Sequence, residues 1–188
     1  MSTALEKQNL RREALARRDA LGERERDAKS LRLCRALDTL GELRGARLVL
    51  CYCPHGSECD LSLLYASLRE RGVTLAFPAA GADGTMEAYV PGAALIRGRF
   101  GIPEPDPARS RLVDPAELDA VLVPCAGFDG ALHRLGHGGG YYDRYLPRCP
   151  RAAAILTAFE AQRLTNVPHE SHDVAFSLLV TEAGVFRK

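Results

Sequence analysis

Short runs of apolar residues alternate with longer amphipathic stretches along most of the chain. Apolar runs bounded by turn residues predict five strands, at 47–53, 73–77, 119–124, 152–158 and 174–181. Stretches rich in Leu, Ala, Arg and Glu, punctuated by glycine, predict helices at 3–20, 24–42 and 60–71. Apolar strands separated by helices are typical of a parallel sheet covered on both faces. The pattern therefore predicts an α/β protein with a mostly parallel central sheet and helices on both faces.

Residues 81–110 interrupt this alternation. They hold many Gly and Pro residues and show no clear period, so we expect an irregular excursion over one edge of the sheet. No internal repeat and no low-complexity linker divides the chain. We therefore expect a single domain over residues 1–188, a length that buries a core without needing a disulfide or a structural metal.

Composition and charge narrow the class of protein. The chain is 46% hydrophobic and 26% charged, with a formal net charge of +1, which gives no general attraction to nucleic acid or membranes. No apolar run is long enough to span a membrane, and the first residues lack the apolar core of a secretory signal. Acids at Glu6, Glu13 and Asp19 argue against an organellar transit peptide. We expect a cytoplasmic protein that binds neither nucleic acid nor membrane.

Cysteines offer two interpretations. The chain has six, and several lie in apolar strand-like runs, which favours buried free thiols in a reducing compartment. Alternatively, the cluster Cys51, Cys53, His55 and Cys59 could hold zinc, although its spacing matches none of the common zinc motifs. We favour the free thiols.

Basic residues recur along one face of the first predicted helix. Lys7, Arg11 and Arg18 are separated by four and seven residues and so lie on the same side, away from the apolar residues Leu10 and Ala14. Such a face is either the solvated side of a surface helix or a set of cations that meets an anionic ligand. Periodicity does not distinguish the two.

A glycine-rich segment follows the strand at 119–124. Gly136 and Gly138–Gly140 precede a predicted short helix at 141–146, and two arginines, Arg134 and Arg144, flank them. Glycine lets backbone N–H groups approach a ligand closely, so the segment can cradle an anion such as phosphate. It is not a Walker A loop, because no Gly-Lys-Ser/Thr ends it, and Tyr141 stands where a dinucleotide fingerprint has its third glycine. A purely structural turn is the alternative.

The residues around this segment resemble one family closely. The run RLGHGGGYYDRYL at 134–146 resembles the RLG-x-G-x-GYYDR signature of the 5-formyltetrahydrofolate cyclo-ligase family. Weaker matches follow the family's order along nearly the whole chain. They are KQNLR at 7–11, SECDL at 57–61, Phe77-Pro78, Met86, FGIPEP at 100–105, VPCAGFD at 123–129 and VPHESHDV at 167–174.

This resemblance implies a fold and a reaction. The family's fold is a three-layer α/β sandwich, in agreement with the pattern above. Its reaction uses MgATP to convert 5-formyltetrahydrofolate into 5,10-methenyltetrahydrofolate, with release of ADP and phosphate. The formyl oxygen is phosphorylated, and N10 then attacks the activated carbon. The implied partners are therefore the small molecules ATP and 5-formyltetrahydrofolate with Mg²⁺, and we expect a monomer.

The resemblance also implies roles for individual residues. Those that would bind ATP are Lys7, Arg11, Arg134, Leu135, Gly136, His137, Gly138, Gly139, Gly140, Tyr141 and Tyr142. Those that would bind the folate are Cys53, Glu58, His137, Gly138, Gly139, Gly140 and Tyr141. Asp143 and Asp173 would hold Mg²⁺, which prefers carboxylate, phosphate and water oxygens. Arg144 and Tyr141 would act in catalysis, although Arg144 could instead merely pair with an acid.

Two positions depart from the family pattern. His137 stands where the family often has an aromatic or basic residue, and an imidazole changes charge near neutral pH. Leu61 replaces the usual threonine and removes one hydroxyl group. Two other functions stay open: a nucleotide-dependent ligase or kinase with another one-carbon substrate, and a non-catalytic module whose basic helix grips RNA or an acidic partner.

Overall fold

The computed structural model describes residues 3–171 and 173–188. Its helices are α1 (Thr3–Asp19), α2 (Glu23–Asp38), α3 (Gly41–Arg44), α4 (Ser62–Glu70) and α5 (Tyr141–Tyr145), with 3-10 turns η1 (Pro107–Arg109), η2 (Pro115–Glu117), η3 (Leu146–Arg148) and η4 (Glu160–Gln162). Its longer strands are β1 (Leu48–Leu50), β2 (Thr74–Ala80), β3 (Met86–Pro91), β6 (Ser110–Leu112), β7 (Ala120–Pro124), β10 (Ala153–Thr157), β11 (Leu178–Thr181) and β12 (Gly184–Arg187). Two small ribbons pair β4 (Ile96–Arg97) with β5 (Pro103–Glu104) and β8 (Gly127–Phe128) with β9 (Arg134–Leu135).

The central sheet is parallel in its middle and antiparallel at both edges. Its order is β12-β11-β10-β7-β1-β2-β3-β6. The strands from β11 to β2 run parallel, as expected for apolar strands joined by crossovers. β12 adds an antiparallel edge beside β11, and β3 and β6 add another beside β2. The predicted fold class, an α/β protein with a mostly parallel sheet, is confirmed.

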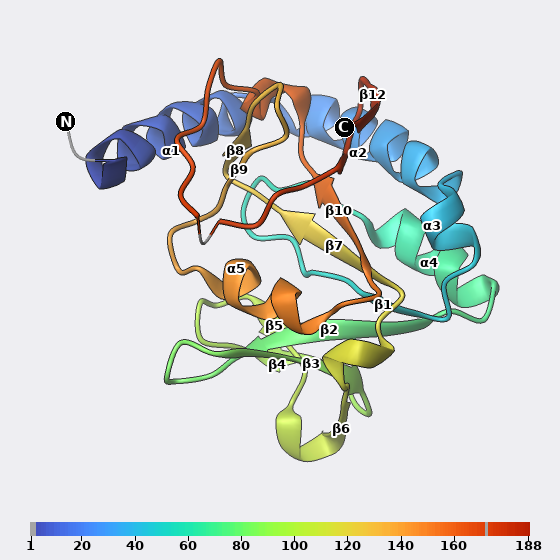
Figure 1. The fold of residues 1–188 in the computed structure, drawn as a ribbon. Helices are drawn as coiled ribbons and strands as arrows, with labels where there is room; N and C mark the ends of the chain where they lie inside the picture. Colours follow the sequence, from blue (N-terminus) through green and yellow to red (C-terminus); the bar gives the residue numbers. More distant parts are fainter. Residues whose placement is uncertain (1–2, 172) are drawn as a thin grey trace.

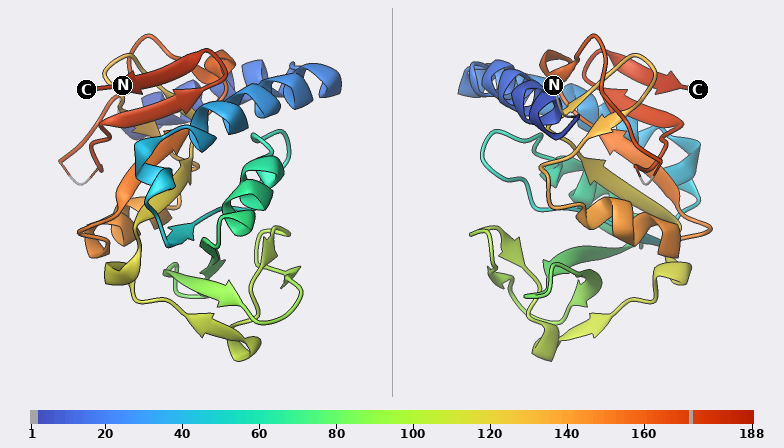
Figure 2. Two further views of the ribbon diagram at one scale, coloured as in Figure 1. Left: turned by 90° about the vertical axis from the view of Figure 1, so that its right-hand side faces the viewer. Right: turned by 60° about the vertical axis from the view of Figure 1, so that its left-hand side comes forward.

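Different elements cover the two faces of the sheet. Residues of α2, α3 and α4 form one core with one face, around Leu33, Leu64 and Leu122. On the other face the cover is thinner: α5 and η3 form a second core with strand residues and with Phe176. Figures 1 and 2 show α1 at the opposite end of the molecule from β6. There α1 contacts η4 and β8, which follow the carboxyl ends of β10 and β7.

Several predicted boundaries need correction. The segment 81–110 is not irregular throughout, because it contains β3 and the start of β6. β2 continues through Pro78 to Ala80, because β1 pairs no farther than Ala76 and the missing proline N–H breaks no ladder bond on that side. The predicted helix at 24–42 is divided into α2 and α3, and β11 begins at Leu178 instead of 174. Among the described residues, none of the helices combines the length and the apolarity that crossing a membrane requires.

Candidate functional site

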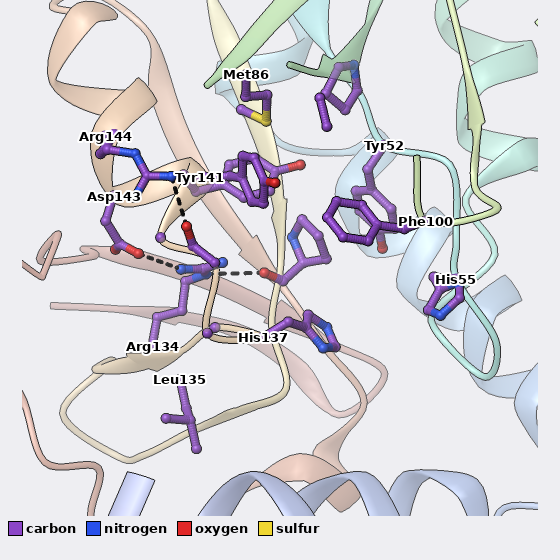
Figure 3. Close-up of a pocket in the computed structure, with 18 of the residues that line it drawn as sticks. Tyr52, His55, Met86, Phe100, Arg134, Leu135, His137, Tyr141, Asp143 and Arg144 are labelled. Atoms are coloured by element: carbon purple, nitrogen blue, oxygen red, sulfur yellow. Dashed lines mark hydrogen bonds and ion pairs between the residues drawn. The ribbon is translucent and has the colours of Figure 1, made fainter. Parts of the chain in front are cut away.

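A cavity of about 930 Å³ opens at the carboxyl ends of the parallel strands, where ligands bind in sheets of this kind. Figure 3 shows part of its lining. Every residue that the sequence analysis assigned to the site lines this cavity. They are Lys7, Arg11, Cys53, Glu58, Arg134, Leu135, Gly136, His137, Gly138, Gly139, Gly140, Tyr141, Tyr142, Asp143, Arg144 and Asp173. Segments far apart in the chain therefore meet at one place, and the roles of these residues stay predictions.

One wall, which we call the glycine wall, consists of residues 134–144 with Lys7, Arg11 and Asp173. Gly138 has φ +100° and Gly140 has φ +64°, a region that side chains with a Cβ rarely adopt. Arg144 Nη2 donates to Gly139 O at 2.8 Å, and the Gly140 N–H of the same trans peptide points in the opposite direction. The amides of Gly138, Gly139 and Gly140 donate no hydrogen bond to the described residues. They are therefore available to an anion.

Basic side chains surround this loop and are held by the protein's own oxygens. Arg11 Nε donates to Gly136 O at 2.7 Å, and burial together with the charge of Arg134 lowers the pKa of Arg11. Arg134 Nε donates to Pro124 O at 3.1 Å, and its guanidinium stacks over the Tyr142 ring. Arg144 Nη2 also reaches Gly84 O at 2.7 Å, in the turn between β2 and β3. Each of these arginines can bind a phosphate oxygen in place of the carbonyl oxygen to which it now donates.

Asp143 and Asp173 lie on neighbouring segments and each meets a cation. Asp173 Oδ2 is 2.7 Å from Lys7 Nζ, which also contacts Glu170 Oε2 at 3.0 Å. Burial lowers the pKa of Lys7, but these two acids outweigh burial and raise it. Asp143 Oδ2 is 3.4 Å from Arg134 Nη1, and its Oδ1 accepts from the Val174 N–H at 3.5 Å.

This donor set fits Mg²⁺ held together with a polyphosphate. The ion takes one or two carboxylates and completes its shell with phosphate and water oxygens. Among the described residues, the cavity lining carries four basic side chains and five carboxylates. Such mixed charge suits a polyphosphate with its cation better than a bare polyanion.

The opposite wall, which we call the Glu58 wall, consists of residues 53–58 after β1. Glu58 is 8% exposed in its side chain. Its Oε2 accepts from the His55 N–H at 2.9 Å, and its Oε1 lies 3.1 Å from His137 Nε2 across the cavity and 3.8 Å from Arg18 Nη1 behind it. This carboxylate is fixed in place and can accept N–H groups of a ligand.

Apolar and aromatic side chains line the space between the two walls. The Phe100 ring, on the loop between β4 and β5, meets the Tyr141 ring edge-on with centroids 6.0 Å apart. Met86, Tyr52 and Phe100 point toward the same space in Figure 3. A flat heterocycle fits between such groups. Met86 and Phe100 were matched by sequence as family landmarks, but only the fold reveals that both line the cavity.

Two predicted site residues direct their side chains into the protein. Leu135 packs with Ala14, Leu164 and Val167 and points away from the cavity centre in Figure 3. Tyr142 is buried in the core beneath α5, and burial raises its pKa. Leu135 can therefore contact a nucleotide only through its backbone.

All six cysteines are free, and five are buried. Cys53, the half-buried one, lines the cavity, and burial together with Glu104 raises its pKa to about 11. It is therefore a neutral thiol near neutral pH and contributes a small apolar surface. In the part of the chain that the structure describes, no three His, Cys, Asp or Glu side chains form a metal-binding group.

The fold and the cavity define an α/β protein with a glycine-loop anion cradle, paired cations and acids, and a pocket for a flat ring. The sequence profile of the 5-formyltetrahydrofolate cyclo-ligase family matches residues 3–182. The chain therefore belongs to the 5-formyltetrahydrofolate cyclo-ligase family, a family of enzymes.

Relatives and solved structures agree with this assignment. A 5-formyltetrahydrofolate cyclo-ligase of Mycolicibacterium smegmatis is 33% identical over 143 residues, 72% of this chain and 73% of that protein. The structure of Aquifex aeolicus 5,10-methenyltetrahydrofolate synthetase superposes with a TM-score of 0.83 at 32% identity, covering 96% of this chain and 92% of that one. A Mycoplasma pneumoniae synthetase gives a TM-score of 0.77 at 22% identity, with coverage of 94% and 98%, which supports the fold alone.

Proposed function

We propose that this chain catalyses the ATP-dependent cyclisation of 5-formyltetrahydrofolate to 5,10-methenyltetrahydrofolate, with release of ADP and phosphate. One observation carries the proposal: a single cavity joins an anion-binding glycine wall to a wall with a buried carboxylate. Two substrates that react with each other need such adjoining sites. Family membership supports the same reaction.

The glycine wall would bind the ATP phosphates. The N–H groups of Gly138, Gly139 and Gly140 point to no internal acceptor among the described residues and would receive phosphate oxygens. Lys7, reaching in from α1, would add positive charge at the end of the chain of phosphates, and so would Arg11. Both already lie at the cavity with their charged ends on protein oxygens.

Mg²⁺ would be held by Asp143 and Asp173 and would neutralise charge on the phosphates during transfer. In the structure, Lys7 pairs with Asp173 and Arg134 pairs with Asp143. Binding would therefore exchange one cation for another, with no acid left uncompensated at any stage.

The Glu58 wall would bind the folate. Glu58 would accept N–H groups of the pterin ring, while Tyr141, His137 and Cys53 surround the ring and its formyl group. His137 occupies Glu58 Oε1 at present, so the ligand would displace the imidazole. Both reacting groups would then meet beside the glycine loop, with their atoms about 3–3.5 Å apart.

The chemistry activates an amide that water attacks slowly. The formyl oxygen attacks the γ-phosphorus of ATP, the bond to ADP breaks, and the oxygen becomes part of a phosphate leaving group. N10 then attacks the formyl carbon and loses its proton, phosphate departs, and the ring closes. Arg144, in the last turn of α5, would stabilise charge on the moving phosphoryl group, and Tyr141 would orient the formyl group.

The test is a rise in absorbance at the long-wavelength band of the methenyl product. Purified protein, MgATP and 5-formyltetrahydrofolate should together give the signal, and omission of any one should abolish it. A folded protein that binds ATP and gives no signal would indicate another one-carbon substrate at the same nucleotide site. We further propose that the chain acts in the cytoplasm as a monomer. Sedimentation of the purified protein checks the oligomeric state.

A further inference from the structure

Arg18 of α1 is a buried charge. It is only 5% exposed, whereas the side chain of its neighbour Arg17 is half exposed and pairs with Glu13 on the surface. The interpretation of a solvated basic face is therefore wrong for Arg18. Burying a guanidinium costs several kcal/mol unless oppositely charged or polar groups compensate it, so its surroundings identify what it serves.

The anion that faces Arg18 inside the protein is Glu58. Arg18 Nε donates to Ser57 Oγ at 2.9 Å, and its Nη1 lies 3.8 Å from Glu58 Oε1. Nη1 is buried and has no hydrogen-bond partner among the described residues. Asp19 also lies 3.7 Å from Nε, but its side chain is mostly exposed, which screens that pair.

The thiols near Glu58 do not supply the negative charge that compensates Arg18. Burial raises the pKa of Cys125 to about 12 and that of Cys59 well above its usual value. Both are therefore neutral near neutral pH. Tyr52 and Tyr142, also near Glu58, are neutral for the same reason. Glu58, with its side chain 8% exposed, is the acid that faces Arg18 in the interior.

Glu58 Oε1 faces two cationic or polar side chains: the buried Arg18 inside the protein and the partly exposed His137 on the cavity side. The His55 N–H fixes the other oxygen, Oε2. On the cavity side His137 contacts Oε1 at 3.1 Å, and its side chain is 42% exposed. A ligand can displace this imidazole at little cost, whereas Arg18 is packed beneath the wall and stays.

We propose that Arg18 is a positioning residue that supports Glu58 from behind and directs its Oε1 into the cavity, where the carboxylate accepts N–H groups of the pterin ring in place of His137. Arg18 does not line the cavity and touches no substrate. The proposal deepens the proposed function and rests on it. It assigns to the basic face of α1 two separate tasks: Lys7 and Arg11 at the phosphates, and Arg18 behind the folate.

The test compares Arg18→Met, which keeps an unbranched apolar stem and removes the charge, with Arg18→Lys and with Arg17→Met as a matched control on the same helix. Steady-state KM for 5-formyltetrahydrofolate should rise roughly fivefold in Arg18→Met, with KM for ATP unchanged. Arg18→Lys should recover most of the loss, and Arg17→Met should behave as the native chain. An Arg18→Met protein with native folate KM, or with both KM values raised equally, overturns the proposal.

A double-mutant cycle separates positioning from general structural support. If Arg18 acts through Glu58, adding Arg18→Met to Glu58→Gln should raise the folate KM no further. A second, additive rise means that Arg18 acts elsewhere and overturns the proposal. Failure of the native chain to convert 5-formyltetrahydrofolate would instead refute the proposed function itself.

Thermal unfolding establishes whether Arg18→Met is folded. If it is not, Ser57→Ala replaces it, because that change leaves the guanidinium in place and removes its hydrogen bond from Nε, together with the bond that Ser57 Oγ donates to the exposed Asp19. A rise of about two- to threefold in folate KM, with ATP use unaffected, supports the proposal. An unchanged folate KM in folded Ser57→Ala overturns it.

Discussion

The two walls of the cavity hold their polar groups in different ways. On the glycine wall the cations Lys7, Arg11 and Arg144 each contact an oxygen of the protein itself at 2.7 Å. On the Glu58 wall a single carboxylate is fixed by a backbone N–H and backed by a buried arginine. The cations of the glycine wall would therefore have to exchange partners when a ligand enters, whereas Glu58 would keep its backbone and arginine contacts and give up only His137.

This difference indicates whether each wall contributes mainly to substrate binding or to the chemical step. In the proposed reaction, partner exchange would let the glycine wall form its strongest contacts only when phosphate and metal are bound, which would favour the step in which charge moves. A preformed carboxylate instead contributes to binding and orientation. Changes in the glycine wall should therefore affect turnover and MgATP together, and changes in the Glu58 wall should affect folate binding.

The largest effect is expected from Asp143→Asn. The amide keeps the shape but loses the charge that would hold Mg²⁺, so kcat/KM for MgATP should fall about 100-fold. Folate binding and thermal unfolding should change little. The measurement is steady-state kinetics at varied Mg²⁺, with Asp106→Asn as the control, because Asp106 caps η1 and asparagine caps equally well. Full activity of Asp143→Asn would remove Asp143 from the metal site and weaken the contrast between the walls.

A smaller and more selective effect is expected from Glu58→Gln. Glutamine removes the charge but retains one acceptor, so KM for 5-formyltetrahydrofolate should rise about tenfold, with KM for ATP unchanged. Initial rates with each substrate varied in turn measure both constants. Glu117→Gln, an exposed acid beside Arg111, is the control. If ATP use suffers instead, the folate does not lie against this wall and the assignment of the two walls is reversed.

Sequence was sufficient for the parts of the molecule that depend on local pattern. The parallel strands β1, β2, β7, β10 and β11 were all found because buried strands need continuous apolar runs. The edge strands β3, β6 and β12 were not, because they are partly exposed and mix apolar residues with polar, charged, Gly or Pro residues. Their place depends on a neighbouring strand that is distant in sequence.

The features of the site also fall into those that one local segment reveals and those that depend on the fold. Glycines and arginines near 134–144 could be identified from one segment, because backbone conformation and charge leave a local signal. The long-range pairings in and behind the cavity could not: Lys7 with Glu170, Phe100 with Tyr141 and Arg18 with Glu58 join residues from different elements. Helical spacing placed Arg18 on the same face as Lys7, but burial depends on what packs over that face.

Asp129 shows how such a distant pairing supports the glycine wall. Its Oδ1 accepts from the N–H groups of Ala131 and His133 at 2.9 and 3.0 Å, and its Oδ2 accepts from the Val167 N–H at 2.9 Å. The turn before the glycine loop is thereby tied to the segment that leads to Asp173. Burial pushes the pKa of Asp129 up, but these N–H groups and the His133 ring outweigh it and hold the pKa below its ordinary value.

The smallest effect on the cavity is therefore expected from Asp129→Asn, which should act on stability before activity. One buried charge-assisted contact is lost, so the free energy of unfolding near neutral pH should fall by about 1–2 kcal/mol. A carboxyl with a depressed pKa stabilises above its ordinary value of 3.8, and this stability is lost as pH falls through the folded-state pKa. The difference in free energy of unfolding between the native chain and Asp129→Asn should thus stay constant above pH 3.8 and narrow only below it.

Denaturant unfolding at a series of pH values measures this difference, with Asp114→Asn, a change at an exposed capping residue, as the control. A difference that widens on acidification would show that Asp129 does not stabilise the fold as an anion.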